Sequence, residues 1–179
     1  EIKLYNKANP LKPWKTMGRM HDKYLIADGK IYILGGRNTY NYFLGDFPGH
    51  KNFDRDVLVV CDEPQKDNSV NQLWNYFETI WEQEDCRYFH NSKKLADRQS
   101  VKKAVLELQE GYQQYFEVNK EKICDTDYAD ETFETEKIIL LSNPIHTQAK
   151  EPVVWYQLGE LMKNAKERVK IHTPYIICN

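Results

Sequence analysis

The sequence predicts an α/β fold in which a mixed β-sheet is flanked by α-helices. Short apolar runs of strand length recur along the chain, beginning near Ile2, Tyr24, Ile31, Val57, Ile138 and Val169. Longer stretches repeat apolar residues at helical spacing, at 69–82, 101–112 and 152–165. Elements that mix in this order along one chain are typical of helices packed on the faces of a sheet.

The composition is that of a folded domain without a strong charge field. The 179 residues are 41% hydrophobic, enough for one core, and the formal net charge is -2. Such a chain has no global field for non-specific binding to nucleic acid or anionic lipid. The four cysteines are scattered and match neither a zinc nor a disulfide pattern. No apolar run approaches the ~20 residues that span a bilayer.

The N-terminal third predicts strands. Ile2 to Tyr5 is expected to lie beside a hairpin whose two strands are Tyr24 to Ala27 and Ile31 to Leu34. The dipeptide Asp28-Gly29 between these strands favours a tight turn. Val57 to Val60 predicts a further, buried strand.

The rest of the chain predicts helices joined by polar connections and two more strands. Ser69 and Gln72 form the pattern of a capping box, so a helix is expected to start there and to run to about Glu82. A second amphipathic helix is expected over 101–112, then an acidic solvated loop over 117–136 and a buried strand at 138–141. Pro152 suits the first turn of a last helix, and a strand-like run follows at 169–177.

The stretch from Met20 to Asn38 holds the residues that can do chemistry. His21 and Lys23 are two apart, which in an extended strand places both side chains on the same face, where they can share one anion. The second strand of the hairpin ends in Gly35-Gly36, where missing Cβ atoms let backbone amides approach a ligand. The Asn38 amide follows two residues later.

The spacing His-x-Lys-x4-Asp-x6-Gly-Gly-x-Asn resembles the HKD motif of the phospholipase D superfamily. His21, Lys23, Asp28 and Asn38 stand at its polar positions. The variant Gly-Gly-Arg-Asn, at Gly35 to Asn38, is most similar to bacterial cardiolipin synthase-type members.

The resemblance implies that this chain is one half of a two-repeat fold. Residues 1–168 would be the first HKD domain and 169–179 the opening strand of a second repeat, so we expect an excised segment. No second His-x-Lys-x4-Asp occurs in the sequence. A second HKD half is therefore the expected protein partner, from the same full-length chain or from a dimer, and the isolated chain is expected to be a poor catalyst.

The resemblance also implies the chemistry: phosphodiester transfer or hydrolysis on a phospholipid through a phosphohistidine intermediate, without a cofactor or metal. The catalytic set it implies is His21, Lys23, Asp28, Asn38 and Asp54, and the substrate-binding set is Lys23, Gly35, Gly36, Arg37 and Asn38. Asp54 is the best match for the carboxylate that orients the catalytic histidine, and Asp56 is the alternative. Asp28 is better suited to ordering the hairpin, or to pairing across the two halves, than to touching phosphorus.

Two other functions fit the same residues, namely a phosphodiesterase or nuclease of this superfamily and a non-catalytic phosphate-binding domain. The near-neutral charge and the acidic segment disfavour a non-specific nuclease, and the Gly-Gly-Arg-Asn variant favours lipid. No specific nucleic-acid partner is expected. The expected location is the cytoplasmic side of a membrane, with peripheral contact.

Overall fold

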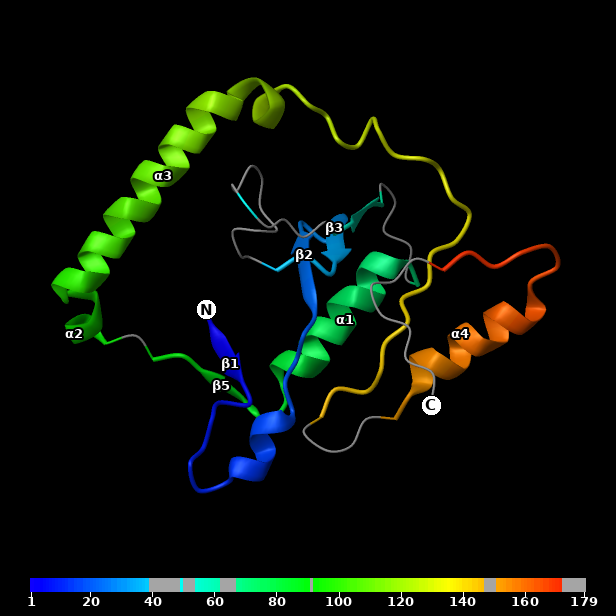
Figure 1. Ribbon diagram of the computed structural model, residues 1–179, viewed down its shortest axis with the longest axis horizontal. Helices are drawn as coiled ribbons and strands as arrows, with labels where there is room; N and C mark the ends of the chain where they lie inside the picture. Colours follow the sequence, from blue (N-terminus) through cyan, green and yellow to red (C-terminus); the bar gives the residue numbers. More distant parts are fainter. Residues whose placement is uncertain (39–48, 50–53, 62–66, 91, 147–150, 172–179) are drawn as a thin grey trace.

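The computed structural model describes residues 1–38, 49, 54–61, 67–90, 92–146 and 151–171 (Figure 1). Its strands and helices, in chain order, are β1 (Lys3–Tyr5), the 3-10 helix η1 (Pro13–Met17), β2 (Lys23–Ala27), β3 (Ile31–Gly35), β4 (Asp56–Val60), α1 (Ser69–Trp81), β5 (Cys86–Tyr88), α2 (Lys93–Ala96), α3 (Gln99–Cys124) and α4 (Val153–Asn164). The chain thus combines helices with sheets, which confirms the general α/β class.

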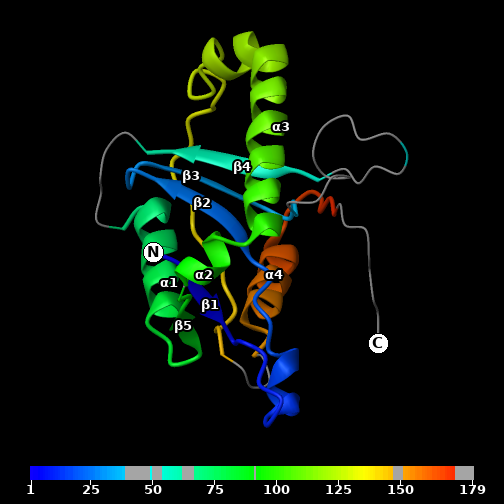
Figure 2. The same cartoon turned by 90° about the vertical axis from the view of Figure 1, so that its left-hand side faces the viewer.

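The strands form two separate antiparallel sheets. One has the strand order β2-β3-β4, and the other pairs β1 with β5 (Figure 2). Every strand pair within the described residues is antiparallel, so the expected mixed sheet does not form there. The expected place of β1 beside the hairpin is also wrong, because β1 pairs with β5, a three-residue strand in a stretch for which the sequence predicts a polar connection.

The hairpin of β2 and β3 forms as predicted. Asp28 and Gly29 both have positive φ angles, 53° and 65°, which is the conformation of a type I′ turn. The Lys30 amide donates to the Ala27 carbonyl at 3.1 Å and closes the turn. This turn fixes the register of the two strands, and β4 continues the sheet on the other side of β3.

The core lies between this three-stranded sheet and α1. Tyr32 and Val59 from the sheet pack with Val70 and Leu73 from α1, and all four are buried. Alternation along the strands places Tyr24 and Ile26 on the same face, toward α1. Tyr32 also donates a hydrogen bond from its hydroxyl to Ser69 Oγ at 3.2 Å, inside the core.

The start of α1 differs from the predicted capping box. Asn68, not Ser69, is the N-cap, and its side chain accepts a hydrogen bond from the Asn71 amide at 2.8 Å. Ser69 is the first helical residue, and its side chain accepts the hydrogen bond from Tyr32 in the core. Gln72 uses its side chain elsewhere, because its Oε1 accepts from the Leu140 amide at 2.9 Å.

That contact lies in the segment 138–141, which is not a strand in the structure. Leu140 packs against the core, but its amide is satisfied by the side chain of Gln72 and not by a neighbouring strand. The predicted strand at 169–177 does not begin in the described residues 169–171, and 172–179 lie outside the described part of the chain.

The later helices, α3 and α4, contribute no residue to this core. α3 is 26 residues long and has no buried residue, and it stands apart from the sheets (Figure 1). α4 starts directly after Pro152, as predicted, and likewise has no buried residue. None of the helices in the described ranges has both the length and the apolar content to cross a bilayer.

Candidate active site at the open end of the hairpin

A row of three residues crosses the sheet at the end opposite to the hairpin turn. Lys23 on β2 pairs with Gly35 on β3, and Gly35 pairs with Asp56 on β4. Because side chains alternate along a strand, this row belongs to the face opposite to Tyr24 and the core. With strands about 4.8 Å apart, a cation and a carboxylate flank a residue that has no side chain.

The two glycines at the end of β3 make room for two carboxylates. A Cβ on Gly35 would collide with the Asp56 carboxylate and would lie 2.9 Å from the Asp56 Cα. A Cβ on Gly36 would lie 2.7 Å from Asp54 Oδ2. Neither glycine has a positive φ angle, so the requirement is for space and not for conformation. In this structure, acidic side chains occupy the space that was expected to admit a ligand.

Arg37 holds the ends of β3 and β4 together. Its Nε donates to Asp56 Oδ2 at 2.7 Å, and its Nη2 donates to the Asp54 carbonyl at 2.9 Å. The ion pair is part-exposed, with side-chain exposures of 37% for Arg37 and 25% for Asp56. The predicted substrate-binding role of Arg37 therefore competes with an ion pair that already offsets its charge.

His21 is exposed and lies two residues before the first paired residue of β2, Lys23. The Lys23 ammonium donates to the backbone carbonyl of His21 at 2.6 Å. This bond folds the lysine side chain back along its own segment and keeps its charge beside the backbone of His21. The two motif residues are thus local neighbours at the open end of the hairpin.

Asp28 and Asn38 occupy different positions relative to this pair. Asp28 sits in the hairpin turn, five residues beyond Lys23 along β2, which at about 3.3 Å per residue is about 16 Å away. The structure therefore does not bring Asp28 to the Lys23 row, and its place in the turn fits the ordering role. Asn38 follows β3 by three residues, at the same end of the strand as Gly35, and is half-buried.

Asp54 and Asp56, the two candidates for the carboxylate that orients His21, have different partners. Asp56 is engaged by Arg37. Asp54 accepts a hydrogen bond from the Arg55 amide at 2.8 Å through Oδ1, and its Oδ2 lies against Gly36. The assignment of the orienting role to Asp54 stays a prediction, and the engagement of Asp56 makes Asp54 the freer carboxylate of the two.

Sequence reasoning missed a polar cluster on the other side of His21. Tyr76 on α1 donates from its hydroxyl to Asp22 Oδ2 at 2.5 Å. Burial and the neighbouring Asp22 carboxylate raise the pKa of Tyr24 to about 12, and burial together with the bond to Asp22 raises the pKa of Tyr76. The alternation of side chains gave the available signal, because Asp22 must face away from its two motif neighbours and toward α1.

This cluster borders a cavity of about 280 Å³ between β1, β2 and α1. The polar side of the lining includes Lys3, Tyr5, Asp22 and Lys23. The buried hydroxyl of Tyr5 has no hydrogen-bond partner among the described residues, and burial raises the pKa of this phenol. Asp22 and Lys23 line the cavity, so it adjoins the segment that carries His21.

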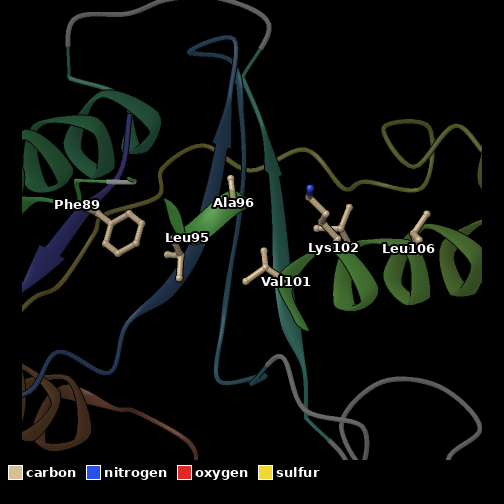
Figure 3. Close-up of a pocket in the computed structure, with 7 residues that line it drawn as sticks. Phe89, Leu95, Ala96, Val101, Lys102 and Leu106 are labelled. Carbon is tan, nitrogen blue, oxygen red and sulfur yellow. The ribbon is translucent and has the colours of Figure 1, made fainter. Parts of the chain in front are cut away.

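The residues that line a larger cavity, of about 580 Å³, are far from the motif in the sequence and differ from it in chemistry. Its lining side chains come from α2, the first turns of α3 and the residue after β5: Phe89, Leu95, Ala96, Val101, Lys102, Val105 and Leu106 (Figure 3). Lys102 is the only charged residue among these, and none is a nucleophile. Size alone therefore does not identify the site, and the residues around the smaller cavity offer more chemistry.

In the described ranges, no three His, Cys, Asp or Glu side chains gather closely enough to hold a metal ion. The groups at the site are instead an exposed imidazole, an ammonium, a guanidinium and two carboxylates. We found no family model, no curated protein and no solved structure that matches this chain.

Proposed function

We propose that the chain catalyses phosphodiester transfer or hydrolysis, with His21 as the nucleophile that forms a phosphohistidine intermediate. The observation that carries this proposal is that His21 is exposed at the open end of the hairpin, where the Lys23 ammonium binds the backbone carbonyl of His21. The HKD-like spacing of the motif supports it. We further propose that the chain is one half of a phospholipase D-like two-repeat fold, close to that of cardiolipin synthases. It would act on phospholipid at the cytoplasmic side of a membrane.

The charges of the site suit an anionic phosphodiester. The Lys23 ammonium, the Asn38 amide and backbone amides near Gly35 would offset charge on the nonbridging oxygens. Arg37 would add to this only if it left Asp56, since their ion pair neutralises both charges. The exposed position of His21 leaves its imidazole open to a bulky substrate.

In the proposed reaction, a ring nitrogen of neutral His21 attacks phosphorus and a new N–P bond forms. The ester O–P bond breaks, and its electron pair leaves with the alcohol oxygen, which takes a proton from the matching histidine of a second HKD half. An alcohol or water, deprotonated by that same histidine, then attacks phosphorus and releases His21. Asp54 would hold the imidazole in the required tautomer and stabilise its positive charge.

A phosphodiester with a good leaving group tests the His21 step without the second half. Bis(p-nitrophenyl) phosphate needs little acid assistance, so His21 should gain a phosphoryl adduct that is stable in alkali and lost in acid. With phosphatidylglycerol vesicles the same step should be slower by about 10² to 10⁴-fold, because the alkoxide needs a proton donor. Mass spectrometry of the peptide that contains His21 measures the adduct.

The matched variants are His21→Gln and His90→Gln, since His90 is an exposed histidine outside the motif. His21→Gln should abolish the adduct, and His90→Gln should leave it unchanged. An adduct that persists in His21→Gln contradicts the assignment. Binding of inorganic phosphate without any adduct also contradicts it, and would point to a non-catalytic phosphate-binding domain.

A further inference from the structure

The backbone that carries His21 is held from the side by its neighbour, Asp22. His21 and Asp22 precede the paired residues of β2, so the antiparallel ladder does not fix them. Their side chains point to opposite faces if the segment is extended. Asp22 then faces α1 while His21 faces solvent, and any contact that fixes Asp22 also limits where the imidazole of His21 can go.

Tyr76 makes that contact from the middle of α1. Its hydroxyl donates to Asp22 Oδ2 at 2.5 Å, across 54 residues of sequence. A phenol that donates to a carboxylate at this distance is among the stronger hydrogen bonds in proteins. The bond ties a segment outside the sheet to the helix that forms the core.

The ring of Tyr76 is itself held in place. It packs against the core cluster, and its centroid lies 6.2 Å from that of Tyr24 at an interplanar angle of 58°. Tyr24 is the first residue after Lys23 and pairs with Leu34 in the sheet. The hydroxyl of Tyr76 is therefore presented to Asp22 from a fixed position, and not from a mobile side chain.

We infer that Tyr76 is a positioning residue for the reaction of His21 and acts through the side chain of Asp22. This inference rests on the proposed function, because it assigns Tyr76 a task in the same site. Tyr76 touches neither substrate nor the reacting atoms. It restricts the backbone at 21 and 22, and with it the positions that the imidazole can take when the phosphodiester binds.

The test compares Tyr76→Phe with Tyr24→Phe. Both remove one phenolic hydroxyl from neighbouring rings, but only Tyr76→Phe removes the bond to Asp22. Tyr76→Phe should slow adduct formation on His21 by about tenfold to a hundredfold, the loss expected for a misplaced reactive group, with little change in KM. Tyr24→Phe should react at nearly the wild-type rate. Equal rates in wild type and a folded Tyr76→Phe would overturn the inference.

A second readout works even if His21 forms no adduct. In ¹³C relaxation measurements on the His21 ring, Tyr76→Phe and Asp22→Ala should both lower the order parameter of Cε1–H. Asp22→Asn keeps an oxygen that accepts the Tyr76 hydroxyl, so it should restore most of the order that Asp22→Ala loses. Unchanged order in Tyr76→Phe, or no rescue by asparagine, would refute the positioning role. If only the proposed function is wrong, no adduct should form, but the variants should still differ in the order parameter of the His21 ring.

Discussion

The carboxylate of Asp56 lies over Gly35, in the space that a side chain at position 35 would need. The two residues are direct partners in the β3–β4 pair, so the strand register sets this contact. Arg37 then binds the same carboxylate from the end of β3. The glycine, the aspartate and the arginine thus form one packing unit beside Lys23.

Gly35→Ala should destabilise the fold. The new Cβ would lie 2.9 Å from the Asp56 Cα, a backbone atom that cannot move without disturbing the β3–β4 pair. We expect the free energy of unfolding to fall by about 1–3 kcal/mol, as in other overpacked sites. Urea unfolding followed by circular dichroism measures this change.

Gly111→Ala is the matched control for the same chemical change. Gly111 lies in α3, where an added Cβ meets nothing within 4 Å. Alanine should therefore stabilise the protein there by about 0.5–1 kcal/mol, through its better helix propensity. A stability gain at both positions would contradict the close packing of Asp56 on Gly35.

Local chemistry accounts for the features that the sequence predicted well. The hairpin turn needs two residues that tolerate positive φ angles, and Asp28-Gly29 supplies them without help from the rest of the chain. The apolar stripe of α1 likewise follows from helical spacing alone. The spacing of the motif then placed His21 and Lys23 together at the open end of the hairpin.

Contacts between distant residues account for what the sequence did not predict. Asn68 and Ser69 are both good capping residues, and the hydrogen bond from Tyr32 decides that Ser69 enters the core. The four-residue apolar run at 138–141 has strand composition, yet the Leu140 amide donates to the side chain of Gln72 and not to a neighbouring strand. The Tyr76 bond to Asp22 also depends on how α1 packs on the sheet, because alternation along the strand indicates the face of Asp22 but not the residue that it meets there.

Gln72→Ala should loosen the 138–141 segment without unfolding α1. The variant removes the Oε1 that accepts from the Leu140 amide at 2.9 Å, while alanine remains a good helix former. Amide hydrogen exchange at Leu140 should become at least about fivefold faster, in line with a lost hydrogen bond of about 1 kcal/mol. Exchange at Leu73, in the same helix, serves as the control. Unchanged exchange at Leu140 would contradict this contact.

The stability of the protein should fall steeply at alkaline pH. In the unfolded chain a tyrosine loses its proton near pH 10, whereas in the folded chain the pKa of Tyr24 is raised to about 12, chiefly by burial. Between these values the unfolded state binds fewer protons, so the free energy of unfolding decreases as pH rises. This contribution is complete below about pH 10 and is lost as pH passes through about 12.

Tyr24→Phe should reduce that decrease, because phenylalanine has no proton to lose. Urea unfolding of wild type and variant at about pH 8 and about pH 11 measures the difference. The two proteins should have similar stability at the lower pH, and the variant should be the more stable at the higher pH. Parallel losses in both proteins would show that Tyr24 does not titrate as its surroundings indicate.

Separate substitutions of Asp54 and Asp56 should distinguish a catalytic carboxylate from a structural one. Asp56→Asn breaks the part-exposed ion pair with Arg37, so it should cost about 0.2–1 kcal/mol of stability. Arg37 keeps its bond to the Asp54 carbonyl but loses the charged partner at position 56, so binding of inorganic phosphate should tighten by about 1.4- to fivefold, the equivalent of that energy. Asp54→Asn keeps the Arg37 pair and the carbonyl that Arg37 binds, so stability should change less.

If Asp54 orients His21, its asparagine variant should instead slow adduct formation by about 10² to 10⁴-fold. Unfolding curves, phosphate calorimetry and quenched-flow adduct measurements on both variants give the three quantities. The reverse pattern, with adduct formation lost in Asp56→Asn and retained in Asp54→Asn, would transfer the orienting role to Asp56.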